Sequence, residues 1–134
     1  RIDYSKPWLQ QHERALVSAY RTSAFFEYYQ DDIFTILDSR PQTLFELNTA
    51  LTARMLKLLG LRCRVSFTGD YLQEYGPDVL DLRDVIHPKK TVPEIFRNRF
   101  KSYYQVFSEK FGFIPGLSAL DLLFNEGPNA LSFL

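Results

Sequence analysis

The sequence predicts a single, mainly α-helical domain of about five helices with one or two short β-strands. Three observations lead to this fold class. Apolar residues recur at helical spacing over much of the chain, residues typical of helix caps precede several of these stretches, and polar and apolar residues alternate over one short stretch near the middle. No repeat or linker divides the sequence, so we expect one domain over residues 1–134.

Two helices are predicted at the start of the chain. The first spans about Lys6–Tyr20, with Ser5 as its N-cap and Pro7 in its first turn. The second spans about Ser23–Leu37 and ends before Pro41, whose ring cannot continue a helix. Both carry apolar residues at helical spacing on one face, so both are expected to pack against a shared core.

A third helix and a strand follow. The sequence Thr43-Leu44-Phe45-Glu46 has the spacing of a capping box, and Gly60 suits the position after the last helical turn. Alternation over Arg62–Phe67 then predicts a short strand, in which Cys63 is expected to be buried. A lone strand leaves its backbone groups unpaired, so we expect it to pair either with part of Tyr71–Leu82 or with a preceding segment outside this sequence.

The C-terminal part predicts two more helices. One ends over Tyr103–Phe111 and is terminated by Gly112, and Pro115-Gly116 forms a turn after it. The last helix begins at Ser118, and Asp121 stands three residues later, in the place of the glutamate of a capping box. Two interpretations of Asp121 therefore remain open, a helix-capping role and a functional one.

Composition excludes several function classes. Sixteen basic and sixteen acidic residues give a net charge of zero, so nothing global indicates nucleic acid as a partner. No apolar stretch is long enough to span a membrane. One cysteine permits no internal disulfide and favours a reducing compartment, by default the cytoplasm. Two histidines and one cysteine, widely spaced, are too few for a predicted metal site, and no glycine-rich loop indicates a nucleotide cofactor.

Two polar side chains stand out as candidates for chemistry. His12 falls on the apolar face of the first helix, where it is either a core residue or a general base. Arg83 follows apolar neighbours and needs a partner, either Asp81 or Asp84 in an ion pair or the anionic group of a substrate. Residues 83–110 carry seven basic and three acidic residues, a net +4, which fits either a solvated face or a phosphate site.

Aromatic residues indicate a binding surface. The run Phe25-Phe26-Glu27-Tyr28-Tyr29 lies within the second helix, and neighbouring helical positions cannot share one face. Some of these rings must therefore point to solvent, to a partner protein or into a pocket.

Read in order, several phrases resemble the WbqC-like protein family of bacteria. The N-terminal ones are Trp8 through His12 to Tyr20, and Phe25 to Tyr29; the later ones are Asp81-Leu82-Arg83, Ile86-His87-Pro88-Lys89-Lys90, Tyr103-Tyr104-Gln105-Val106-Phe107, Gly112 to Ser118, and Asp121 to Asn125. The resemblance extends over essentially the whole chain. Family proteins are longer, so we expect this chain to be about the C-terminal two thirds of such a protein.

The resemblance implies a role in the biosynthesis of O-antigen or another surface polysaccharide, as a transferase that modifies an activated or amino sugar. In that role His12 would be the catalytic base, and Arg83 and Lys89 would bind the phosphate of a nucleotide sugar or the acyl donor. The resemblance also implies substrate-binding roles for Tyr104, Gln105, Asp121 and Asn125. The alternative is a non-catalytic helical module that binds a partner protein through its exposed aromatic residues.

Overall fold

The computed structural model describes residues 1–83, 85, 96 and 100–134. Within these residues the fold is mainly helical, as predicted. Helix α1 spans Trp8–Tyr20, α2 spans Phe26–Asp38 and α3 spans Leu44–Leu58. A short α5 spans Ser108–Phe111, α6 spans Ala119–Glu126, and a 3₁₀ helix, η1, spans Gly127–Phe133. The described helices are too short or too polar to cross a lipid bilayer.

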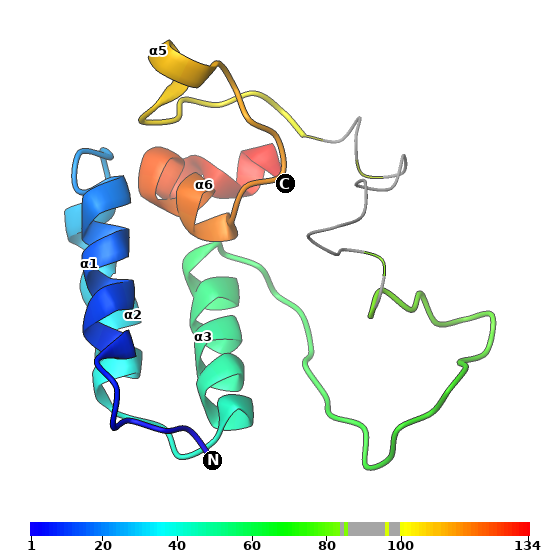
Figure 1. Cartoon of the computed structure of the whole chain (residues 1–134). Helices are drawn as coiled ribbons and strands as arrows, with labels where there is room; N and C mark the ends of the chain where they lie inside the picture. Colours follow the sequence, from blue (N-terminus) through cyan, green and yellow to red (C-terminus); the bar gives the residue numbers. More distant parts are fainter. Residues whose placement is uncertain (84, 86–95, 97–99) are drawn as a thin grey trace.

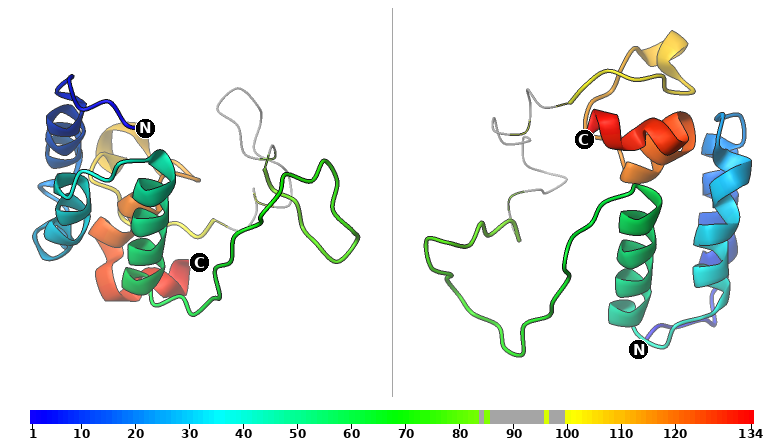
Figure 2. Two further views of the ribbon diagram at one scale, coloured as in Figure 1. Left: turned by 90° about the horizontal axis from the view of Figure 1, so that it is seen from below. Right: turned by 180° about the vertical axis from the view of Figure 1, so that it is seen from behind.

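The first three helices stand side by side, and α6 lies across one end of them (Figures 1 and 2). Short turns join α1 to α2 and α2 to α3, so neighbouring helices run antiparallel. One core cluster fills the space between them, and a second lies where α3 meets α6 and η1. The buried members are Leu9, Ile33, Leu37 and Leu47 in the first cluster and Leu59, Leu122, Leu123 and Ala130 in the second.

The start of α1 lies two residues later than predicted. The Ser5 N–H donates a hydrogen bond to the Asp3 carboxylate, 2.8 Å away, which forms a local turn in place of a helix cap. Pro7 then occupies the N-cap position, with no side-chain cap. The turn is fixed by a second bond, in which the Trp8 indole donates to the Asp3 carbonyl at 2.9 Å.

The start of α2 is delayed by a tertiary contact. The Phe25 N–H donates to the carbonyl of Phe124 in α6 at 2.9 Å, so residues before Phe26 form a turn against α6. The Phe25 ring also lies where a side chain on Gly127 would be, because a Cβ there would approach the ring to 2.6 Å. Packing against a distant helix, rather than local propensity, sets this boundary.

The capping box at the start of α3 is confirmed. Thr43 Oγ1 accepts from the Glu46 N–H at 3.1 Å, and the Glu46 carboxylate accepts from the Thr43 N–H at 3.2 Å. Gly60 follows the C-cap with φ of 72°, as expected for the residue after a helix.

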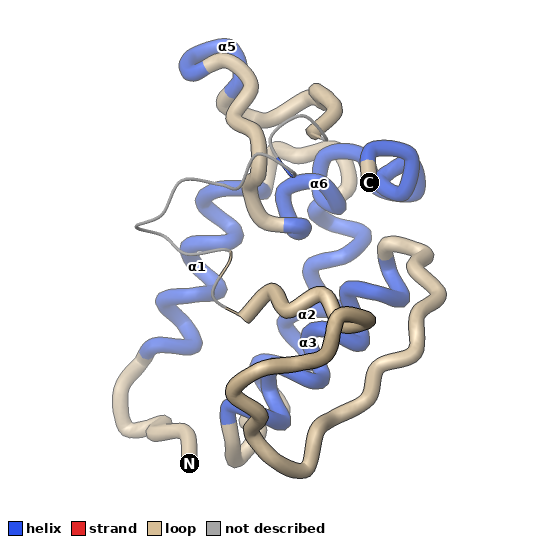
Figure 3. The backbone as a smooth tube through the Cα atoms, turned by 90° about the vertical axis from the view of Figure 1, so that its right-hand side faces the viewer, coloured by secondary structure: helices blue, strands red, loops and turns tan. Residues whose placement is uncertain are grey.

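The predicted strand at Arg62–Phe67 is wrong. Figure 3 shows loop in this segment, and the described residues contain no strand. No described backbone group forms a hydrogen bond with residues 62–67, so the segment lacks the partner that a strand needs. The alternation instead turns Val65 and Phe67 toward α3, where Phe67 contacts the ring of Phe45 at a centroid distance of 4.9 Å. Cys63, expected to be buried, is exposed.

Candidate functional site

The centre of the candidate site is Asp121, in the first turn of α6. Ser118 is the N-cap, as predicted, because its Oγ accepts from the Leu120 N–H at 3.2 Å. Asp121 does not complete a capping box. Its carboxylate is turned into the molecule, and the residue is 5% exposed. The Tyr103 hydroxyl donates a hydrogen bond to Asp121 Oδ2 at 2.7 Å, and the Gln105 amide nitrogen donates one to the same oxygen at 3.3 Å.

Gln105 connects the site to the loop that follows α5. Its amide nitrogen donates to the Ile114 carbonyl at 2.9 Å, and its amide oxygen accepts from the Ile114 N–H at 2.9 Å. The side chain is 4% exposed and uses both ends of its amide. Gln105 therefore fixes the loop over α6 and positions the carboxylate of Asp121 at the same time.

Asn125 lies one turn further along α6. Its Nδ2 donates to the Asp121 backbone carbonyl at 2.8 Å, and the residue is 6% exposed. Its buried Oδ1 has no hydrogen-bond donor among the described residues. The face of α6 that meets Tyr103 and Gln105 therefore carries more acceptors than the described donors satisfy.

Two tyrosines take part in the electrostatics of this cluster. Burial, and then the hydrogen bond to the Asp121 carboxylate, raise the pKa of Tyr103 well above its ordinary value of 10.0. Burial also raises the pKa of Tyr20, and the nearby Asp121 charge adds to the shift. Tyr103 is the donor in its hydrogen bond to Asp121, and the Tyr20 phenol also lies close enough to interact with the carboxylate.

A hollow of about 290 Å³ lies beside this cluster, between the end of α1 and the loops around α5. We call it the Asp121 hollow. Its polar wall is formed by Tyr20, Gln105 and Asp121, and the rings of Phe107 and Phe111 form another part of its lining. A buried carboxylate in the wall of a small cavity can accept hydrogen bonds from the hydroxyl or amino groups of a ligand.

His12 lies on a different hollow. It is exposed on α1, and it lines an apolar groove of about 530 Å³ between α1, α2, α3 and the start of α6. The interpretation of His12 as a core residue is therefore wrong. Its Nδ1 lies 2.8 Å from the Trp8 carbonyl, which can only accept, so Nδ1 carries the proton and a neutral ring leaves Nε2 as a base.

The two hollows adjoin but do not coincide. Ala19 and Tyr20 line both of them. His12 precedes Ala19 by two helical turns, which is about 10 Å along the axis at the rise of an α-helix. His12 and Asp121 therefore line separate hollows.

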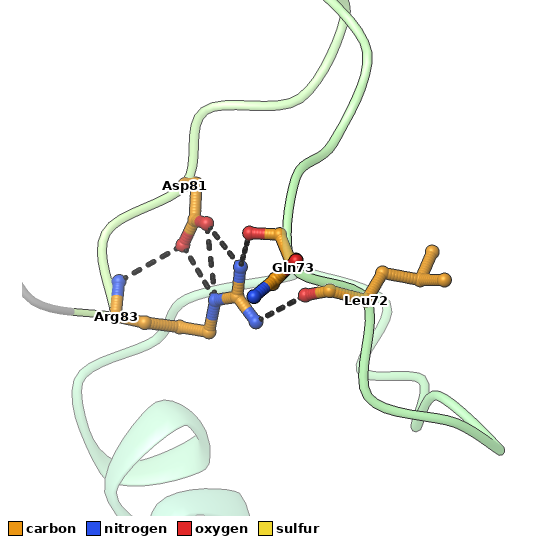
Figure 4. Close-up of polar contacts among 4 residues, drawn as sticks. All are labelled: Leu72, Gln73, Asp81 and Arg83. Carbon is orange, nitrogen blue, oxygen red and sulfur yellow. Dashed lines mark hydrogen bonds and ion pairs between the residues drawn. The ribbon is translucent and has the colours of Figure 1, made fainter.

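Arg83 belongs to the long segment that follows α3, and all its described contacts are local (Figure 4). It forms an ion pair with Asp81 and donates to the carbonyls of Leu72 at 2.8 Å and Gln73 at 3.3 Å. Its guanidinium also lies 4.9 Å from the ring centroids of both Tyr71 and Tyr75. The pair raises the pKa of Arg83, mainly through its hydrogen bonds to Asp81, and lowers the pKa of Asp81 to about 2.

The structure therefore brings together three of the seven predicted site residues. Gln105, Asp121 and Asn125 form one buried cluster. Tyr104 is exposed beside it, Lys89 lies outside the described residues, and His12 and Arg83 lie elsewhere. Figure 1 shows the segment around Arg83 on the far side of α3 from α1. The ion pair that the sequence suggested for Arg83 is present.

Sequence reasoning missed two members of the cluster, Tyr20 and Tyr103. The sequence predicts Tyr103 in the final turns of a helix, which is wrong because α5 begins only at Ser108, and it predicts Tyr20 as the last residue of the first helix, which is confirmed. One signal in the sequence indicates Tyr103: it stands beside Tyr104 and Gln105 in an aromatic-rich segment. Nothing local connects either ring to Asp121, because the Tyr103 contact spans 18 residues.

Comparisons with known proteins add a family but no relative with a described activity. No curated protein and no solved structure matches the chain. A family model, that of the WbqC-like protein family, matches residues 1–88. The match covers α1, α2, α3 and the segment that contains Arg83, and it includes Tyr20 but ends before Gln105, Asp121 and Asn125. Because the match extends over more than half of the sequence, the chain belongs to the WbqC-like protein family.

Proposed function

We propose that this protein is an enzyme of bacterial surface-polysaccharide biosynthesis, such as O-antigen assembly, and that it is a transferase modifying an activated or amino sugar in the cytoplasm. Family membership supports the biological setting. The observation that carries the proposal is the Asp121 hollow, a small cavity with a buried carboxylate, an amide and a phenol in its wall. Sugars present hydroxyl and amino donors, and the carboxylate in this wall can accept hydrogen bonds from them.

The size of the hollow limits what it can enclose. Its volume of about 290 Å³ lies just below the range of about 300–1,000 Å³ that is usual for small-molecule sites. One sugar ring is therefore the proposed occupant, and the nucleotide of an activated sugar would extend outside. The neighbouring apolar groove, about 530 Å³ in volume with His12 on its edge, is the proposed place for the donor of the transferred group.

A binding and turnover assay tests this function. Purified protein is mixed with nucleotide sugars and acyl donors, unfolding temperature is measured with each, and products are identified by mass spectrometry. We expect a sugar-dependent rise in unfolding temperature that Asp121→Asn abolishes. Glu126→Gln is the matched control, because it removes a carboxylate on the same helix from a residue that does not line the hollow. An equal rise in wild type and Asp121→Asn would refute the site.

One observation favours the alternative, a module that binds a partner protein. Phe45 and Phe67 pack on each other but remain 61% and 59% exposed, and Tyr28 is 78% exposed. The Phe25 ring lies 6.3 Å from that of Tyr28, but Phe25 is half-buried against Gly127, so Tyr28 is the exposed member of the pair. Under this alternative Phe67→Ser weakens partner association in cells, and Asp121→Asn leaves it unchanged. If the protein is a transferase, Asp121→Asn should reduce polysaccharide decoration in cells, and Phe67→Ser should leave it unchanged.

A further inference from the structure

Asp121 combines a negative charge with burial, a combination that needs compensation. A carboxylate removed from water loses several kcal/mol of solvation unless charge or hydrogen bonds replace it. The ion pairs among the described residues are Arg54 with Asp32 and Arg83 with Asp81, and neither includes Asp121. Tyr103 and Gln105 are neutral donors. In the described part of the chain the carboxylate of Asp121 is therefore hydrogen-bonded but is not paired with a cationic side chain.

The carboxylate also has an oxygen left for a ligand. The hydrogen bonds from Tyr103 and Gln105 both end on Oδ2, and Asp121 is part of the wall of the hollow. Oδ1 accepts neither of these two bonds and, although the Tyr20 phenol also interacts with this carboxylate, it keeps acceptor capacity for a bound molecule. A charged donor such as an ammonium group forms a shorter and stronger hydrogen bond to a carboxylate than a neutral hydroxyl does.

Aromatic rings complete the wall around this acceptor. Tyr20, Phe107 and Phe111 line the same hollow as Asp121. The faces of such rings attract cations within about 6 Å of the centroid, and rings combined with a carboxylate form a typical recognition site for ammonium groups. Phe111 already contacts a cation, because Lys110 Nζ lies 5.0 Å from its ring centroid, which leaves Phe107 as the clearer probe.

We infer that the Asp121 hollow binds the protonated amino group of a free amino sugar, with Asp121 as the acceptor and the ring of Phe107 as part of the cation-binding wall. The inference rests on the proposed function and specifies its acceptor substrate. A sugar whose nitrogen is already acylated would be excluded, because an amide carries no charge and is larger. The hollow would therefore select a substrate before its amine is modified.

The test uses two sugars that differ only at the nitrogen. Glucosamine and N-acetylglucosamine are titrated into the protein at a pH where the glucosamine amine is protonated, and binding is followed by calorimetry. We expect wild type to bind glucosamine at least about tenfold more tightly, the ratio that one charge-assisted hydrogen bond provides. Asp121→Asn should abolish this preference, and Glu126→Gln should retain it.

Phe107→Leu is a second test variant in case Asp121→Asn fails to fold. Phe107 is 53% exposed, so removal of its ring leaves the core intact. We expect glucosamine binding to fall by about two- to fivefold, with N-acetylglucosamine unaffected. Equal binding of both sugars by wild type would overturn the amine inference and leave the sugar site standing. Binding of neither sugar would overturn the inference and the proposed sugar site together.

Discussion

A buried carboxylate changes how the neighbouring phenols titrate, and this effect is measurable at the scale of single residues. The pKa of Tyr103 is raised because its ring is desolvated and its hydroxyl donates to Asp121. An unfolded chain releases the same proton near the ordinary pKa of 10.0, whereas the folded chain retains it. The folded state then binds more protons than the unfolded state, so the free energy of unfolding falls as pH rises above 10.0.

Tyr103→Phe tests this coupling. The stabilisation from the raised pKa is complete below pH 10.0 and is lost as pH rises through the pKa of the folded state. We expect the variant to show a shallower loss of stability in alkaline solution, measured by urea unfolding at a series of pH values. Tyr104→Phe, at a 60% exposed ring, is the control and should match wild type. Identical alkaline slopes for Tyr103→Phe and wild type would contradict the proposed coupling.

A glycine at the end of α6 is required by its neighbour as well as by its backbone. Gly127 has φ of 53°, and a Cβ there would lie 2.6 Å from the Phe25 ring. Gly112 has φ of 70° and open space around it. We expect Gly127→Ala to cost about 2 kcal/mol more than Gly112→Ala, because only the former adds overpacking to backbone strain. Urea unfolding of both variants measures the difference, and equal losses would show that Phe25 moves aside freely.

Among the elements, those set by local residues could be predicted from the sequence. The capping box of α3 needs only Thr43 and Glu46, three positions apart, and it forms as expected. The carboxylate of Asp121 stands at the same spacing from Ser118, yet it turns inward to Tyr103 and Gln105. Those partners are 18 and 16 residues away, and no local rule reports which of the two competing arrangements has the lower free energy.

The α3 cap gives a prediction at the scale of an element. Thr43→Ala removes the acceptor for the Glu46 N–H, and we expect a loss of about 1 kcal/mol in the free energy of unfolding. Thr43→Ser keeps the hydroxyl and should lose much less. Thermal unfolding with hydrogen exchange in the first turn of α3 separates the two. If Ala and Ser behave alike, the hydrogen bond in the cap contributes nothing measurable.

Considered as a whole, the molecule has a helical body and a long segment that is held by few contacts with it. The body was predictable because its apolar residues follow helical spacing and meet in two core clusters. The segment from Leu61 to Arg83 was not, because alternation at Arg62–Phe67 is typical of a strand whether or not a partner exists. In the described residues no partner forms, and the same pattern packs two side chains against α3.

The contacts of Arg83 predict that this segment can loosen without unfolding the body. Its described partners, which include Asp81 and the rings of Tyr71 and Tyr75, all lie within residues 71–83. Arg83→Lys keeps the charge but loses the planar fork that reaches the carboxylate and two carbonyls together. We expect cleavage within residues 71–83 to become severalfold faster in limited proteolysis, because local opening controls it.

The unfolding temperature of the helical body should stay within about 1 °C, since none of these contacts reaches a helix. Arg62→Lys is the matched control in the same segment and should change neither measurement. The pKa of Asp81 is lowered from 3.8 to about 2, so the contribution of the ion pair is complete above pH 3.8 and is lost as the pH falls through about 2, and the resistance of the wild-type segment to proteolysis should fall over that range. A fall in unfolding temperature for Arg83→Lys as large as that of a core substitution would show instead that the segment and the body fold as one unit.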